Sequence, residues 1–298
     1  MIAFIDAHRG QFGVQPVCRV LKEHGVKIAP STYYAARRPA SARAHRDAVL
    51  LAEITRVHKE NGEVYGARKV WLQLHREGIT CARCTVERLM RAAGLRGVRR
   101  GRRTRTTIPA TRKSWPPDLV NRNFHAAAPN RLWVADITYV PITAGGFAYA
   151  AFVIDAFSKM ITGWKVAAHM RASLALDALE MAVSARLRAG QQVAGVIHHG
   201  DRGGQYLAIR YTSRLAEAGA IASVGSKGDS YDNALAETII GLYKAELIRH
   251  RGPWHSVALA EAATAWWVGW FNNRRLYRPL GDIPPAEYEQ NWLEGQQP

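Results

Sequence analysis

Apolar residues recur at the spacing of helices in the first third of the chain. The pattern predicts one short helix over residues 16–24 and another that begins at Ser31. A second, better-marked pair covers 67–76 and 85–93, with Gly78 between them. Two short helices about a glycine-containing turn are typical of a module that reads DNA. The alternative is a small helical bundle that presents a solvated basic face.

Beyond residue 130 the pattern changes to the alternation of strands. Three β-rich segments follow one another, and the pair Gly145–Gly146 between the first two indicates antiparallel hairpins. Two shorter strands then alternate with helices. We predict strands over 131–142, 147–158, 160–168, 193–198 and 220–224, and helices that carry Leu176 and Leu179, that cover 209–218, and that carry Glu237. The predicted fold class is α/β, a mixed five-stranded sheet flanked by helices, preceded by a small all-α, helix-turn-helix-like region.

The C-terminal part is predicted to be a helix over 258–277 that contains Trp266, Trp267 and Trp270. These side chains are expected to cover the core, and the alternative is that they stack on nucleic-acid bases. The patterns divide the chain into an N-terminal helical segment (1–44), a helix-turn-helix-like DNA-binding domain (45–98), a basic linker (99–125), a sheet-containing core (126–250) and a C-terminal tryptophan-rich helix and tail (251–298).

The positive charge is concentrated before the predicted sheet. The formal charge is +17, and residues 1–113 carry 24 Lys and Arg against 8 Asp and Glu, whereas 114–298 carry 17 against 16. Such a surplus suits a polyanion such as DNA, or an anionic membrane surface. Nine basic residues lie from Arg91 to Lys113, where the chain has no acidic residue and little apolar periodicity.

We interpret this basic stretch as a flexible linker that neutralises DNA phosphates without reading the sequence. The alternative is a charge run that only aids solubility. The residues predicted to bind phosphate are Arg99, Arg100, Arg102, Arg103, Arg105, Arg112 and Lys113.

Other features of the composition bear on compartment and on zinc. No apolar run reaches the roughly 18–20 residues of a membrane-spanning helix, and the first residues do not form a secretory signal. Cys18, Cys81 and Cys84 form no disulfide framework. We therefore expect a cytoplasmic, nucleoid-associated protein with no membrane partner. The Cys81-x-x-Cys84 pair makes zinc a weaker alternative, although His58 and His75 have the wrong spacing for it.

Three acidic residues carry the predicted chemistry. Asp136 lies in a strand-like run on the opposite face from its neighbours, Asp201 directly follows a predicted strand, and Glu237 comes after 35 intervening residues. Converging carboxylates repel one another unless divalent cations neutralise them. Two Mg²⁺ ions roughly 3.5–4 Å apart, for which Mn²⁺ can substitute, serve the attacking and leaving oxygens of an in-line phosphodiester displacement. The set therefore predicts cutting or joining of nucleic acid.

Lys244 completes the helical face that Glu237 begins. Glu237, Gly241 and Lys244 stand at i, i+4 and i+7, which places the lysine about 10 Å along the axis from the glutamate. Gly241 has no side chain, so the helix surface between Glu237 and Lys244 is expected to be uncovered and a DNA backbone could lie close to it. The alternative is an ordinary surface lysine. The buried stripe of the same helix is predicted to be Leu235, Ile239 and Leu242.

Further polar residues are weaker candidates. At most one of the adjacent His198 and His199 can point to the site, and His199 is the candidate for positioning substrate. Asp155, on a neighbouring strand, is interpreted as a supporting or structural residue. Asp229 and Asp232 are expected to cap the helix that follows them rather than to bind metal.

These motifs resemble those of the retroviral-integrase-like transposases of bacterial insertion sequences, specifically the downstream-frame (OrfB) product of the insertion sequence three family. Matching stretches are 133–139, 153–158, 163–164, 198–206, 231–237, 244–246 and 271–275, with 65–69 and 88–91 upstream. Where many members have a histidine after the arginine pair near the C-terminus, this chain has Leu276 and Tyr277.

The resemblance implies an RNase H-like core in which Asp136, Asp201 and Glu237 bind two Mg²⁺ ions, with Lys244 as the basic residue after the glutamate. It implies hydrolysis at the element end to free a 3′-OH, which then attacks target DNA without a covalent protein intermediate. The implied partners are terminal inverted repeats, target DNA, further copies of the chain, and the upstream-frame product as a fusion or separate protein. Two alternatives are a nuclease that cuts without joining and a non-catalytic DNA-binding regulator derived from a transposase.

Overall fold

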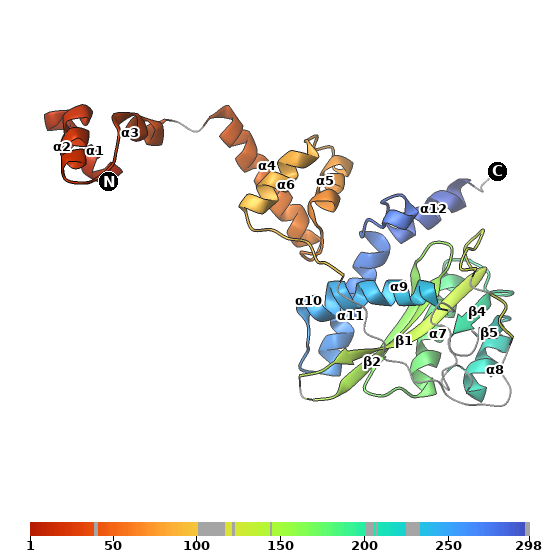
Figure 1. Ribbon diagram of the computed structural model, residues 1–298. Helices are drawn as coiled ribbons and strands as arrows, with labels where there is room; N and C mark the ends of the chain where they lie inside the picture. Colours follow the sequence, from red (N-terminus) through yellow and green to blue (C-terminus); the bar gives the residue numbers. More distant parts are fainter. Residues whose placement is uncertain are drawn as a thin grey trace.

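The computed structural model describes residues 1–38, 41–100, 117–120, 123–143, 145–200, 206, 208–224 and 233–295. The first three helices, α1 (Ile2–Phe12), α2 (Val14–Glu23) and α3 (Pro30–Arg37), lie apart from the rest of the molecule (Figure 1). They pack around a small core of their own, which contains Ile5, Val17, Cys18, Ile28 and Tyr33. The two helices predicted in this segment are confirmed, and α1 precedes them.

A second helical unit consists of α4 (Ala42–Glu60), α5 (Ala67–Arg76) and α6 (Arg83–Ala92). The helix pair predicted here is confirmed as α5 and α6. Gly78 ends α5 because its φ of +80° allows the amide of Ile79 to return to the carbonyl of Leu74 at 2.9 Å. The long helix α4 packs on both and was not predicted. We call these three helices the helical module.

The sheet has the predicted mixed, five-stranded form. Its strands are β1 (Leu132–Pro141), β2 (Phe147–Asp155), β3 (Ile161–Ala167), β4 (Ile197–Gly200) and β5 (Ile221–Val224). Their order is β3-β2-β1-β4-β5. The first three strands are antiparallel, and β1, β4 and β5 are parallel, which confirms both the hairpins and the α/β class. β4 begins later than predicted because Val193 and Val196 are buried in a turn before it.

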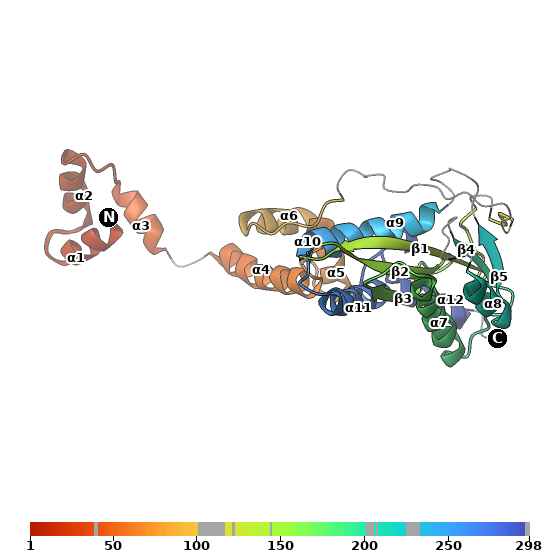
Figure 2. The same cartoon turned by 90° about the horizontal axis from the view of Figure 1, so that it is seen from below.

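Helices cover both faces of the sheet, as Figure 2 shows. On one face, α7 (Ala172–Arg188) and α8 (Ile209–Glu217) pack on alternate strand residues that include Trp133 and Ala135. On the other face, α9 (Ala234–Tyr243) packs on the intervening set, which includes Val134 and Phe152. This alternation, with a period of two, decides which side chains of β1 face α9.

The helix of Glu237 is longer than α9 alone. It continues through a π-helical turn, η1 (Lys244–Ile248), into α10 (Arg249–Arg251). The predicted buried stripe was partly wrong: Ile239 is buried, but Leu235 and Leu242 are only partly buried. The most deeply buried side chains of α9 are Ala236, Ile239, Ile240 and Tyr243.

The C-terminal part covers the β3 edge and the helical module. Helix α11 (Val257–Asn273) is followed by the short 3₁₀ helix η2 (Arg278–Leu280) and by α12 (Pro285–Gly295), which was not predicted. Trp267 and Trp270 are buried, so that the prediction of a core role for them is confirmed, whereas Trp266 is 39% exposed.

The helical module is docked on this C-terminal part. The Tyr65 hydroxyl accepts a hydrogen bond from the Leu276 amide at 2.7 Å. Arg68 makes a two-pronged ion pair with Asp282, at 2.9 and 2.7 Å. Apolar side chains of the module and of the sheet domain therefore belong to one continuous core. Within the described ranges, no helix has the length and apolar character needed to cross a bilayer.

Candidate active site

Strand β1 presents Asp136 toward α9. Its neighbours Ala135 and Ile137 belong to the core under α7 and α8, while Val134 belongs to the core under α9. Since successive side chains of a strand point to opposite faces, Asp136 lies on the α9 side. This confirms the predicted orientation of Asp136 relative to its neighbours.

Helix α9 brings Glu237 to the same side. Glu237 lies in the first turn of α9, and Asn233 occupies the N-cap position. The side-chain amide of Asn233, which is buried, donates to the carbonyl of Ala135 at 3.0 Å. The start of the helix is thus fastened to the residue that precedes Asp136. Sequence reasoning missed Asn233; Asp229 and Asp232, the residues expected to cap this helix, lie outside the described residues.

Lys244 follows Glu237 about two turns further along the same helix. Burial lowers the pKa of the Lys244 ammonium, the charges of Asp136 and Glu237 act against this shift, and the charge of Arg249 adds to it. These directions agree with the position of Lys244 on the same helix as Glu237 and on the side of the sheet that Asp136 faces. Strand β1 and one helix therefore place Asp136, Glu237 and Lys244 on the same side of the sheet, with Lys244 about two turns beyond Glu237.

The third predicted carboxylate, Asp201, lies outside the described residues. Gly200, which precedes it, pairs with Ala135 across β1 and β4. Of the predicted metal ligands, the description therefore covers Asp136 and Glu237. Two carboxylates on one side of a sheet, close to a single ammonium, are a donor set of hard oxygens that suits Mg²⁺ or Mn²⁺.

Arg100 occupies the space over Gly241. A Cβ added at Gly241 would lie 2.2 Å from Nη2, 2.8 Å from Cζ and 3.0 Å from Nε of Arg100. The prediction that the helix surface at Gly241 is uncovered was wrong, because the guanidinium of Arg100 packs against it. The charge of Arg100 also reaches Tyr277. The guanidinium of Arg100 thus lies between Glu237 and Lys244 along the helix axis, on the exposed side of the helix.

The other predicted phosphate-binding residues divide into two groups. Arg99 is described and is exposed, next to Arg100 at the start of the basic stretch. The remaining five, Arg102, Arg103, Arg105, Arg112 and Lys113, lie outside the described residues.

The two histidines before Asp201 point to opposite faces, as predicted. His199 is 1% exposed, and its Nδ1 lies 2.9 Å from the Ser223 hydroxyl of β5. His198 turns the other way, with Nε2 3.0 Å from the Tyr211 hydroxyl, and burial lowers its pKa to about 4. Substrate positioning by His199 stays a prediction, and burial of the ring leaves little of it accessible to DNA.

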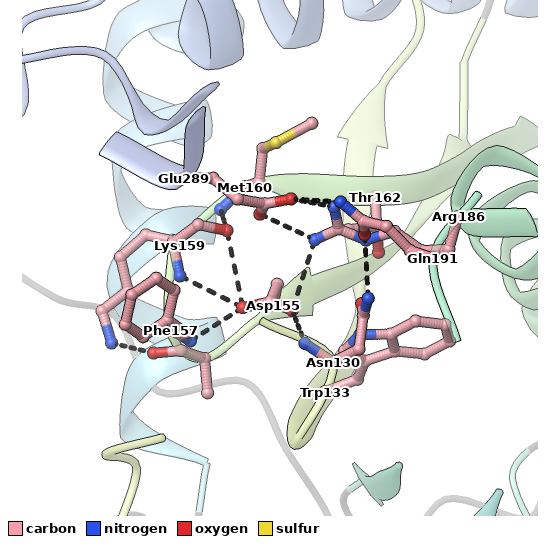
Figure 3. A network of polar contacts seen from close by, with 12 residues as sticks. Asn130, Trp133, Asp155, Phe157, Lys159, Met160, Thr162, Arg186, Gln191 and Glu289 are labelled. Atoms are coloured by element: carbon pink, nitrogen blue, oxygen red, sulfur yellow. Dashed lines mark hydrogen bonds and ion pairs between the residues drawn. The ribbon is translucent and has the colours of Figure 1, made fainter. Parts of the chain in front are cut away.

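Asp155 has a structural role. It is fully buried and accepts hydrogen bonds from the amides of Asn130 and Phe157, both at 2.8 Å. Its partner Arg186, also buried, joins it to Glu289 of α12, as Figure 3 shows. Asp155 thus fastens the end of β2 to α7 and to the C-terminal helix. This agrees with the interpretation of Asp155 as a supporting residue.

The cysteine pair shows no ligand geometry within the described chain. His75 places Nε2 2.9 Å from the backbone carbonyl of Cys81, and burial raises the pKa of the Cys81 thiol. Among the described residues, which include both cysteines, no group of three or more His, Cys, Asp or Glu side chains could hold a metal ion. The predicted set of three carboxylates is not among these groups, since Asp201 lies outside the described residues.

Three family models match the chain. Two carry the description "Integrase core domain" and match residues 126–230 and 219–285, and one is an "HTH-like domain" that matches residues 44–103. The first two contain the sheet, α9 and all three predicted carboxylates. The third contains the helical module and the first basic residues after it.

Proteins similar over most of the chain are named as transposases. A protein of Shigella sonnei named as the transposase for insertion sequence element IS629 is 52% identical over 97% of this chain and 96% of its own length. A protein of Mycobacterium tuberculosis that carries the name of a transposase for insertion sequence element IS986/IS6110 is 58% identical over 88% of this chain and 95% of its own. Transposase InsF for insertion sequence IS3A of Escherichia coli (strain K12) is 32% identical over 97% of this chain and 98% of its own length.

Proposed function

Since the chain belongs to the IS3 family of insertion-sequence transposases, enzymes that transfer DNA strands, we propose that Asp136, Asp201 and Glu237 form its metal-dependent active site. The reaction is 3′-end cleavage at the ends of an insertion sequence, followed by strand transfer into target DNA. The proposal rests on the placement of Asp136 and Glu237 on one side of the sheet, where the start of the Glu237 helix is fastened to Ala135. Asp201 is included because it follows Gly200, whose partner across the sheet is Ala135.

Two Mg²⁺ ions, for which Mn²⁺ can substitute, would be held by these three carboxylates and would supply charge neutralisation and activation of oxygen nucleophiles. Without divalent ions the carboxylates would repel one another and the DNA phosphate, so the site is expected to bind DNA more weakly when these ions are removed. In the first step the oxygen of water bonds to phosphorus while the bond to O3′ breaks. In the second step the freed 3′-OH attacks a target phosphodiester and a target 3′-OH leaves.

Lys244 and Arg100 would orient the DNA backbone for both steps. An ammonium acts on a phosphate as a point charge, whereas a guanidinium can donate two parallel hydrogen bonds to phosphate oxygens. Arg100 rests over Gly241, between the levels of Glu237 and Lys244, so that the two cations would contact neighbouring phosphate oxygens of one strand. Holding the reacting phosphorus against the carboxylates in this way is a contribution of position.

The helical module would supply the sequence-specific contacts with the element end, with α6 as the second helix of its pair. We keep the division at 45, 99, 126 and 251 as the proposed domain boundaries. Both ends of an element must be processed together, and we therefore expect several copies of the chain on DNA. The upstream-frame product is proposed as a partner, fused or separate, and the cytoplasm, at the nucleoid, as the place of action.

The test is a joining assay with the full chain. DNA labelled at a terminal inverted repeat is incubated with a target plasmid and Mg²⁺ or Mn²⁺, beside Glu237→Gln and the control Glu217→Gln. Glu217 is an exposed carboxylate of α8 whose side chain is 69% accessible, on the face opposite Glu237. We expect label to join the plasmid with the wild type and the control, but not with Glu237→Gln.

Other outcomes would replace the proposal. Release of labelled ends without joining would identify a nuclease. DNA binding without any reaction, also when the upstream-frame product is fused, would identify a regulator that has lost catalysis. Equal joining by Glu237→Gln would exclude Glu237 from the active site.

A further inference from the structure

An open pocket of about 330 Å³ lies where the helical module meets the helix of Glu237. Four cationic or titratable side chains line it: Arg96 and Arg99 from the segment after α6, and Arg249 and His250 from α10. Among the described residues that line it, none is acidic. A concave site with three guanidinium groups has the composition of a phosphate site rather than of a contact between proteins.

The wall formed by residues 95–99 is fixed to the helical module. The Val98 amide donates to the Val64 carbonyl at 3.0 Å, and His58 Nε2 donates to the Arg96 carbonyl at 3.2 Å. A Cβ added at Gly97 would lie 2.3 Å from the backbone nitrogen of Gly66, so the two segments cross in direct contact. This wall therefore carries its arginines on a supported backbone.

The opposite wall is also held in place. Ala245 is buried, and His250 Nε2 donates to the Gly62 carbonyl of the module at 3.1 Å. Arg251 lies over the Trp266 ring at 4.6 Å, and that ring covers Gly62. The two walls are thus joined at one side of the pocket, while the side chains of Arg249 and His250 remain exposed.

The pocket continues the cationic face of the catalytic helix. Arg249 is near enough to Lys244 to affect its pKa, and Lys244 is near Asp136 and Glu237. The π-helical turn between Lys244 and Arg249 carries one extra residue, which changes the face on which Arg249 emerges. Arg249 lies twelve positions beyond Glu237, or about 18 Å of helix, which corresponds to about five nucleotides of one strand.

We propose that this junction pocket, with Arg96, Arg99 and Arg249 as its cations, binds a backbone phosphate of the element-end DNA about five nucleotides from the cleaved bond. The inference rests on the proposed function and extends it: one phosphate is held at the boundary between the module that reads the DNA and the domain that cuts it. The pocket would therefore set the register between the recognised sequence and the active site, without reading a base itself.

The test is phosphate-ethylation interference on a duplex that carries the terminal inverted repeat, bound by the full chain in Ca²⁺ so that no strand is cut. For the wild type we expect interference at a phosphate about five nucleotides from the cleavage position. Arg249→Ala should abolish the interference at that phosphate and preserve it elsewhere, and Arg249→Lys should retain part of it. Because Arg249 is exposed, its truncation leaves the core intact.

Arg188→Ala is the matched control. Arg188 is an exposed arginine at the end of α7, on the other face of the sheet. In a titration with salt, Arg249→Ala should reduce the slope of log K against log salt by about 0.9, the value for one phosphate contact on duplex DNA. Arg188→Ala should leave both the slope and the interference pattern unchanged.

Wild-type joining is measured in a parallel Mg²⁺ reaction, so that the two proposals can fail separately. If the wild type joins DNA and Arg249→Ala leaves interference and slope unchanged, the pocket assignment is wrong and the proposed function stands. If Arg249→Ala removes the interference at one phosphate while the wild type joins nothing, the phosphate site stands and the transposition chemistry fails. If Arg188→Ala changes the salt slope and the interference pattern as much as Arg249→Ala does, the effect is one of overall protein charge and the assignment is wrong.

Discussion

Replacing Gly241 with alanine is expected to change the stability and the DNA activity of this protein in opposite directions. Gly241 lies inside α9, where alanine is favoured over glycine by about 0.5–1 kcal/mol because it restricts the unfolded chain. The new Cβ would lie 2.2 Å from Nη2 of Arg100. Ordinary van der Waals contact begins near 3.4 Å, so the guanidinium must retreat by more than about 1 Å.

The retreat costs the fold little, because Arg100 is exposed and its far end is flexible. It would, however, remove a charge-assisted hydrogen bond to a DNA phosphate, which is worth about 1.5–3 kcal/mol. If that bond is made in the transition state, kcat/KM for joining falls about 10- to 150-fold. The free energy of unfolding in urea and the joining rate of a labelled element end are the two measurements.

Gly269→Ala is the control, since Gly269 also lies in a helix and nothing comes within 4 Å of a Cβ added there. It should raise the free energy of unfolding by a similar amount without affecting the joining rate. Arg100→Ala should reproduce the loss of joining, and adding Gly241→Ala to it should cause no further loss. Normal joining by Gly241→Ala, or additive losses in the double variant, would refute the role assigned to Arg100.

Three further predictions concern the scaffold. Burial lowers the pKa of His198 from its ordinary value of 6.5 to about 4, so that as the pH falls this histidine is protonated in the unfolded chain before it is protonated in the folded one. Between pH 6.5 and 4 the wild type should therefore lose about 3 kcal/mol more unfolding free energy, measured in urea, than His198→Gln. Arg68→Glu should loosen the docked helical module by breaking the ion pair with Asp282, seen as faster hydrogen exchange in α5, and the swap with Asp282→Arg should restore protection; unchanged exchange in the single variant would contradict this. Arg186→Met leaves two buried carboxylates without their shared cation and should cost about 3–5 kcal/mol of unfolding free energy, so that a loss below 1 kcal/mol would show that the network is not a support.

The sequence was sufficient for the sheet and for the direction of Asp136, because both depend on a periodicity of two that is local. Burial of Trp267 and Trp270 in α11 followed from apolar composition, whereas Trp266 of the same helix is exposed. Helix α12 was missed because the side chain that it buries most deeply within the helix is a charged one, Glu289, which pairs with the distant Arg186, while its aromatic contacts are those of Tyr288 and Trp292 with Phe157. The stripe of α9 was displaced because a helix under a sheet buries small residues such as Ala236 where β1 approaches closely.

The site shows the same limit at the level of single contacts. The positions of Glu237, Gly241 and Lys244 in the sequence predict room beside the glycine, but they cannot tell which other side chain of the folded protein occupies it. Arg100 lies far from Gly241 in sequence, and its guanidinium reaches the glycine only because residues 95–99 are held against the helical module by contacts such as that between Gly97 and Gly66. A basic stretch that reads as uniform in the sequence therefore begins, in the folded chain, with arginines in two distinct places.

The continuous helix from α9 to α10 explains how these places act together. Its first turn is fastened to β1 through Asn233, and its last turn to the helical module through His250. Between these points the helix carries the catalytic glutamate proposed above, then Lys244, then Arg249. Because one stiff element joins both attachments, a shift of the module relative to the sheet would have to bend the helix or break one of them. DNA bound by the module, as proposed above, would therefore be presented to the carboxylates at a distance that the helix determines.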